Sequence, residues 1–235
     1  MKKTLELRIR KYSALLIVLF FFSSCHLLYL PNNVHVPMLS QSGDFSANIG
    51  TGSSYTNLQA AYSPTTNLGV MMNLSFGGSA DENTSNENKF GFGEIGIGYY
   101  NPLSKAFLFD FYGGYGVGLS ETYENSLNVP TTVNGMYSRL FLQPSITLSA
   151  KDVLDLNFAI RPTLIFMKTN SNVQVSNVGL FVEPALTLKY GWKHFKIINQ
   201  VGLSLPLNAV NFGFNPFILN VGISYQFKSK WKNNN

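Results

Sequence analysis

The stretch LDLNFAIRPTL, residues 154–164, alternates apolar and polar side chains with a period of two. Leu154, Leu156 and Phe158 share one parity, whereas Asp155 and Asn157 share the other. Successive side chains of a β-strand point to opposite faces, so this stretch predicts a strand with one apolar and one polar face. In a soluble sandwich the apolar face would form the core, whereas in a membrane barrel it would face lipid and the lumen would be polar.

The same alternation continues on both sides of this stretch, from residue 44 to residue 227. It predicts ten strands, near residues 44–51, 55–63, 67–76, 90–100, 106–119, 136–149, 153–168, 174–190, 196–207 and 216–227. Many of them have the length that a tilted strand needs to cross a bilayer. Aromatic residues lie near strand ends, as membrane-interface girdles require: Tyr99, Tyr100, Tyr190, Trp192, Phe195, Tyr225 and Phe227.

These features predict an all-β fold, an antiparallel up-and-down transmembrane β-barrel of about ten strands at residues 44–227. Eight strands with longer loops, or a soluble or periplasmic sandwich, are the alternatives. Pro144, Pro162 and Pro184 fall inside the predicted strands. Proline removes a ladder hydrogen bond, so each predicts a bulge or a misplaced strand boundary.

The predicted connections differ in length. Those after the second, fourth, sixth and eighth strands are tight, whereas residues 77–89 and 120–135 form long polar loops. Outer-membrane barrels have short periplasmic turns and longer external loops. With an even number of strands, both ends of the barrel chain are expected in the periplasm.

The composition agrees with a chain that meets lipid through strands. Charged residues make up 12% of the 235 residues and aromatic residues 14%. The formal net charge is +5, but five basic residues and one acidic residue before residue 12 supply +4 of it. The basic balance therefore belongs to a targeting segment and argues against a nucleic-acid partner.

The N-terminal residues have the organisation of a bacterial lipoprotein signal. A basic segment is followed by the apolar run Ala14–Phe22, two serines and Cys25, which is the only cysteine. We predict a signal peptide at residues 1–24, lipidation of Cys25 and a tether at residues 25–43. Residues 228–235 are predicted to be a basic polar tail. One cysteine excludes a disulfide within the chain.

Five stretches resemble a family of Gram-negative outer-membrane β-barrel lipoproteins of unknown function. They are NLGVMMNLSF (67–76), FGEIGIGYYNPL (92–103), FYGGYGVG (111–118), RLFLQPSI (139–146) and FVEPALTLKYGWK (181–193). The resemblance covers most of residues 31–227. It implies the barrel fold, contact with outer-membrane lipids and an outer-membrane location, but no activity and no functional residue. In addition, LNVGISYQF (219–227) resembles the C-terminal signature that the barrel-assembly machinery recognises.

Strand parity places a set of charged side chains in the predicted lumen. They are Glu94, Asp110, Arg139, Asp155, Arg161, Glu183 and Lys189, accompanied by Tyr112, Gln143, Asn157 and Gln200. Charges away from bulk water must be paired or hydrated. The favoured interpretation is a salt-bridged network that fills the lumen. A charged constriction that selects ions or small solutes is the alternative.

Nothing in the sequence favours catalysis. His26 and His35 fall in the predicted tether and His194 in a predicted periplasmic turn, with no cysteine–histidine pair, zinc spacing or serine elbow. Glu94 and Asp110 lie on neighbouring predicted strands and could pair as carboxylates for acid–base chemistry, but Arg139 or Arg161 is the better partner for either as a counter-ion. The glycine runs at residues 91–98 and 113–118 lie inside strands, with no helix following, which argues against a phosphate loop.

We therefore expect a non-catalytic barrel lipoprotein without cofactor or metal. Its expected role is structural or in surface interaction through polar external loops. A narrow channel for ions or small solutes is the alternative function.

Overall fold

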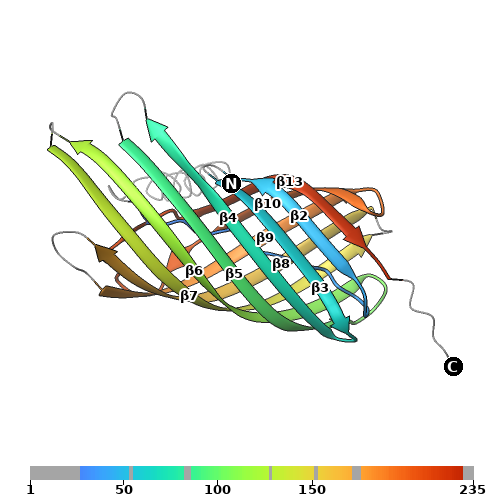
Figure 1. Ribbon diagram of the computed structural model, residues 1–235. Helices are drawn as coiled ribbons and strands as arrows, with labels where there is room; N and C mark the ends of the chain where they lie inside the picture. The colour runs from blue at the N-terminus through green and yellow to red at the C-terminus, as the bar shows by residue number, and fades with distance from the viewer. Residues whose placement is uncertain are drawn as a thin grey trace, which may run out of the picture.

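A closed antiparallel β-barrel is the central feature of the computed structural model (Figure 1). The structure describes residues 27–52, 55–81, 86–126, 129–150, 153–170 and 176–229. Within these ranges ten strands form the barrel wall: β2 (Phe45–Thr51), β3 (Tyr55–Thr65), β4 (Leu68–Asp81), β5 (Asn86–Pro102), β6 (Phe107–Ser126), β7 (Val129–Ala150), β8 (Leu154–Asn170), β9 (Ser176–Gly191), β10 (Phe195–Leu203) and β13 (Phe217–Phe227).

Each wall strand pairs with the next wall strand along the chain, and β13 pairs with β2 to close the ring. Three short strands complete the description: β1 (Leu27–Tyr29), β11 (Leu205–Pro206) and β12 (Gly213–Phe214). The described residues contain no helix of the length and hydropathy needed to cross a membrane. The predicted fold class and strand number are confirmed, and the eight-stranded and sandwich alternatives are excluded.

The two ends of the barrel differ. The turns after β3, β5, β7 and β9 are short and lie, with the end of β13, at what we call the short-turn end. At the other end, which we call the hairpin end, β4 to β7 extend well beyond the rest of the wall (Figure 1).

The hairpin end corrects the sequence prediction of long loops. Residues 77–81 and 86–89 of the first predicted loop belong to β4 and β5, and residues 120–126 and 129–135 of the second belong to β6 and β7. Residues 82–85 and 127–128 lie outside the described residues. The backbone ladders β4–β5 and β6–β7 continue along these polar stretches.

The outer face of the wall is apolar. Ile95, Leu142 and Val221 are each more than half exposed although they are large and hydrophobic. Outward aromatic side chains gather at the short-turn end, among them Trp192, which is 78% exposed. Tyr100 corrects the predicted girdle, since it points inward and its hydroxyl lies 2.6 Å from the hydroxyl of Ser63.

The three strand prolines do not introduce bulges. Ile160 pairs with Pro184, and Pro162 pairs with Val182, in the same register as the rest of the β8–β9 ladder. Across Pro144 the β7–β8 ladder is interrupted between the pairs Phe141–Thr163 and Ser145–Ala159, but it resumes in the same register. The barrel therefore tolerates missing ladder bonds without a shift of either strand.

Glycines on the inner face of β6 leave room for aromatic side chains. A Cβ atom at Gly118 would lie 2.2 Å from the ring of Tyr137, and one at Gly114 would lie 2.6 Å from the ring of Phe141. The glycine runs are therefore parts of strands whose inner faces are filled by neighbouring rings.

Candidate functional site

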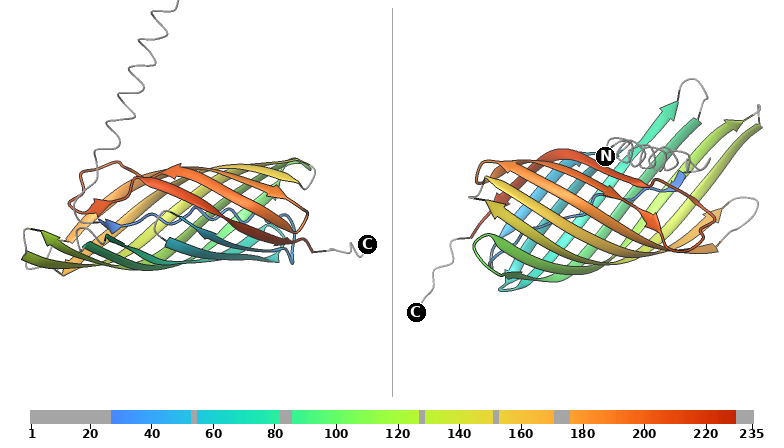
Figure 2. Two further views of the ribbon diagram at one scale, coloured as in Figure 1. Left: turned by 90° about the horizontal axis from the view of Figure 1, so that it is seen from above. Right: turned by 180° about the vertical axis from the view of Figure 1, so that it is seen from behind.

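The lumen is occupied by the chain itself. Residues 27–39, which we call the lumen segment, run through the barrel from the hairpin end to the short-turn end, between the two walls seen in Figure 2. Every residue from Leu28 to Leu39 is buried. At the hairpin end, β1 pairs in parallel with β12, and Thr122 of β6 donates a hydrogen bond to the carbonyl oxygen of Leu27.

This path corrects the predicted tether, which over residues 27–39 is not a solvated linker but part of the barrel interior. The two ends of the barrel wall, Phe45 and Phe227, pair at the short-turn end, as an even number of strands predicts. Leu27 lies at the opposite, hairpin end. Cys25, the signal peptide and residues 230–235 lie outside the described residues.

Wall side chains bind the backbone of the lumen segment. Gln200 of β10 accepts a hydrogen bond from the backbone N–H of Val34 and donates one to its carbonyl oxygen, both at 2.8 Å. Lys189 of β9 donates to the carbonyl oxygen of Val36 at 2.9 Å. Gln143 of β7 donates to the carbonyl oxygen of residue 35 at 2.7 Å. Three polar residues predicted for the lumen thus hold the segment as a neighbouring strand would.

A layer of paired charges surrounds the middle of the lumen segment. Arg139 forms an ion pair with Glu94, and Arg161 forms one with Glu183 in which Nη2 and Oε2 are 2.7 Å apart. Arg161 also lies 3.8 Å from Glu94, so the two pairs join into one network. All four side chains have no exposed surface. Two positive and two negative charges balance within this layer.

The lumen segment completes the charged layer. Asn32 donates to Glu94 at 3.1 Å, accepts from Arg139 at 2.6 Å through its side chain, and accepts from Arg161 at 2.9 Å through its carbonyl oxygen. The Tyr29 hydroxyl donates to Glu183 at 2.7 Å. Buried charges need such additional hydrogen bonds to offset their desolvation.

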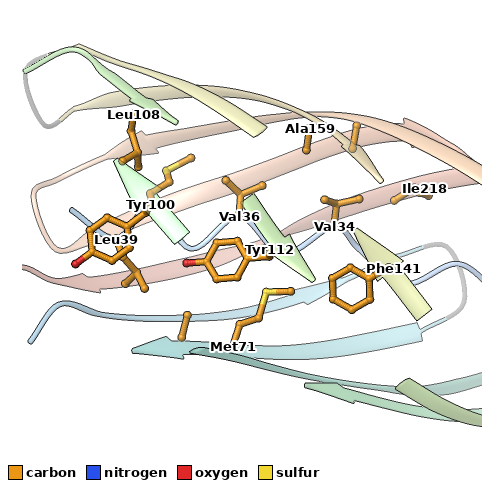
Figure 3. Close-up of a cluster of buried hydrophobic side chains, with 13 residues drawn as sticks. Val34, Val36, Leu39, Met71, Tyr100, Leu108, Tyr112, Phe141, Ala159 and Ile218 are labelled. Carbon is orange, nitrogen blue, oxygen red and sulfur yellow. The ribbon is translucent and has the colours of Figure 1, made fainter. Parts of the chain in front are cut away.

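Apolar side chains fill the lumen on both sides of the charged layer. Toward the hairpin end, Leu28 and Tyr29 contact a cluster from the wall and from the connection between β10 and β13: Phe92, Tyr137, Ile165, Met167, Phe181 and Phe212. Toward the short-turn end, Val34, Val36, Met38 and Leu39 contact a second cluster that includes Met71, Tyr112 and Phe141 (Figure 3). The charged layer is therefore closed off in both directions.

The other predicted lumen charges also point inward but lie nearer the short-turn end. Asp110 accepts a hydrogen bond from Ser145 at 2.6 Å, and Asp155 forms an ion pair of 2.6 Å with Lys196. All seven predicted charges are buried. They do not form a single network. Glu94 has an arginine counter-ion, Arg139, as the sequence favours over a carboxylate pair with Asp110, whereas Asp110 accepts a hydrogen bond from Ser145 and has no arginine partner among the described residues.

Sequence reasoning missed Lys196 and the lumen segment. Lys196 has the same parity as Gln200, and this parity predicts that it points inward. Eight of the thirteen residues at positions 27–39 are apolar or aromatic, too many for a solvated tether. That composition was the available signal for burial.

The described residues hold no group of three or more histidine, cysteine, aspartate or glutamate side chains that could bind a metal ion. His35 is buried in the lumen, and His194 lies in the turn before β10, where its Nδ1 is 2.9 Å from the carbonyl oxygen of Gln226. The polar side chains of the lumen form ion pairs and hydrogen bonds.

No protein-family model and no curated protein matches the chain. Among solved structures, it is similar to the translocator domain of the autotransporter NalP from Neisseria meningitidis. The TM-score is 0.47 and the sequence identity 11%, over 78% of this chain and 86% of that chain. No residue role or activity is carried over from this likeness.

Proposed function

We propose that this protein is a non-catalytic, non-conducting outer-membrane barrel that acts in surface interaction. The observation that carries the proposal is the lumen segment, which fills the barrel and is held by hydrogen bonds from several wall strands. A barrel with two apolar clusters and a charge-balanced layer inside offers no continuous aqueous path. A closed lumen leaves the outer surface and the projecting hairpins as the places where function resides.

The outer face supports the membrane location. Large apolar side chains cover it, while the polar and charged side chains of the wall point inward. This is the reverse of a soluble protein and the arrangement of barrels in outer membranes. The exposed aromatic residues at the short-turn end support a membrane interface there.

The projecting hairpins support the interaction role. β6 and β7 pair as far as Ser126 and Val129, whereas the β7–β8 ladder ends at Asn134, so the tip of β7 extends past its neighbour. Met136 and Thr132 both point outward and are exposed, but Met136 is apolar whereas Thr132, nearer the tip, is polar. A hairpin that leaves the apolar band in this way is available to a partner outside the membrane.

The proposal includes lipidation of Cys25 and insertion of the barrel by the assembly machinery through β13. The first described residue, Leu27, lies at the hairpin end. Mass spectrometry of the mature N-terminus tests the modification. A Cys25→Ser variant that keeps the same acyl mass, or a wild-type protein without one, would contradict it.

Planar-bilayer conductance is the experiment that tests the closed lumen. The folded full-length protein is expected to give no discrete current steps, whereas a variant lacking residues 27–39 is expected to give them. Folding and insertion of both are checked by the shift in gel mobility between unboiled and boiled samples. Discrete steps from the folded wild-type protein, altered by Arg139→Ala, would overturn the proposal in favour of a narrow channel.

For the surface role, trimming both hairpin tips should abolish partner binding by intact cells, and unchanged binding would contradict that role.

A further inference from the structure

A pocket at the short-turn end collects lysine side chains from separate parts of the chain. Its volume is about 330 Å³. Lys105 comes from the turn after β5, Lys193 from the turn after β9, Lys196 from β10 and Lys228 from the residue after β13. Asp155 of β8 is the only carboxylate among the described lining residues.

The positive charge of this pocket is only partly compensated. Lys196 is paired with Asp155 at 2.6 Å. Lys228 lies 3.4 Å from Asp44 and also donates to the carbonyl oxygen of Met38 at 2.7 Å. Lys105 and Lys193 are exposed at the rim and make no ion pair with any residue that the structure describes. Four amines therefore share two carboxylates, which leaves a net charge of +2.

Repulsion among these amines makes the site receptive to an anion. Burial lowers the pKa of the Lys228 amine below its usual value, although Asp44 raises it, and Lys196 lowers it further. A bound anion would offset both the burial and the repulsion. Ser104, Ser149 and Gln226 also line the pocket and add hydroxyl and amide groups between the lysines.

We propose that this pocket binds a phosphate group. Lysine binds phosphate as a point charge and needs no bidentate geometry, so amines converging from four segments suit a tetrahedral anion with several acceptor oxygens. The volume fits a headgroup or a small phosphate compound and excludes a folded polymer. The site goes beyond the proposed function, because it lies at the end opposite the projecting hairpins and does not require an open lumen.

Binding of inorganic pyrophosphate to the full-length protein in zwitterionic detergent, measured by calorimetry at constant ionic strength, tests the proposal. The double variant Lys105→Ala/Lys193→Ala is expected to bind about tenfold more weakly than the wild type, since two charge contacts are lost. These lysines are exposed in turns, so the variant should keep the heat-dependent gel shift of the folded barrel.

The matched control is Lys89→Ala/Lys168→Ala, which removes the same charge at the hairpin end and should bind as the wild type does. Equal weakening in both double variants, or no binding by the wild type, would overturn the proposal.

Repeating the titration in phosphatidylglycerol vesicles distinguishes a lipid headgroup from a soluble phosphate compound. Loss of pyrophosphate binding there identifies a lipid headgroup as the occupant, whereas retained binding identifies a soluble phosphate compound. Bilayer conductance is expected to be the same in all these variants, so failure of phosphate binding is distinguishable from failure of the closed-barrel proposal.

Discussion

Replacing Arg161 with methionine removes the cation that links the two carboxylates of the charged layer. Its Nε and Nη2 atoms lie 2.8 Å and 2.7 Å from Glu183 Oε2, and Nη2 also donates to the carbonyl oxygen of Asn32. Hydrogen bonds to charged groups contribute about 1.5–3 kcal/mol each, and removing one partner of a buried ion pair costs about 3–5 kcal/mol. Glu183 retains its bond from Tyr29, so we expect a destabilisation of about 4 kcal/mol rather than complete failure to fold.

Urea unfolding of the barrel in lipid vesicles, followed by tryptophan fluorescence, measures this change. A loss of about 4 kcal/mol corresponds to nearly a thousandfold change in the unfolding equilibrium. The double variant Arg161→Met/Glu183→Gln should be less destabilised than the sum of the two single variants, because no uncompensated charge is left at Glu183. Additive effects, or a single Arg161→Met variant within about 1 kcal/mol of the wild type, would refute a buried, coupled ion pair.

Three further changes have defined outcomes. Gly118→Val should lower the free energy of unfolding by about 1–3 kcal/mol, because its side chain would clash with the ring of Tyr137. As a control, Gly91→Ala should leave the urea midpoint unchanged, because its added Cβ meets no atom within 4 Å. On intact cells a membrane-impermeant maleimide should label Thr132→Cys at the projecting tip but not Ser104→Cys at the short-turn end, and the opposite pattern would reverse the orientation. Burial lowers the pKa of Lys228, so the unfolded chain binds this proton more tightly than the folded protein does. The stability of the wild type relative to Lys228→Met should therefore rise as the pH increases toward the ordinary pKa of lysine, and a flat or falling difference would contradict this burial.

Whether a wall side chain points into the barrel or outward could be predicted from the sequence, because successive residues of a strand point to opposite faces. A period of two assigns Glu94, Arg139 and Arg161 to the inner face whatever the neighbouring strands do. Which charge pairs with which is a property of the register between strands. It also depends on the side chain of Asn32, which reaches the network from outside the sheet.

The lumen segment and the strand ends could not be placed by the same rule. Residues 31–37 contain two prolines and two asparagines and form no strand, so alternation gave no direction for them. Burial there depends on contacts with strands that follow more than a hundred residues later, such as the bonds from Gln200 to Val34. At the hairpin end, polarity predicts solvent exposure correctly but cannot distinguish a solvated loop from a solvated ladder.

The passage of residues 27–39 through a closed ring constrains the order in which the molecule is assembled. The ring is sealed where Val221–Phe227 of β13 meets Phe45–Thr51 of β2. Leu27 and Asp44 lie at opposite openings of the barrel. The chain between them must therefore be enclosed while the seam forms, or be threaded through the closed ring afterwards. Enclosure during sealing needs no threading step, and it makes the seam the last contact to form. The closed ring then holds the lumen segment in place mechanically. Its release requires either opening of the seam or withdrawal of the segment along the barrel axis.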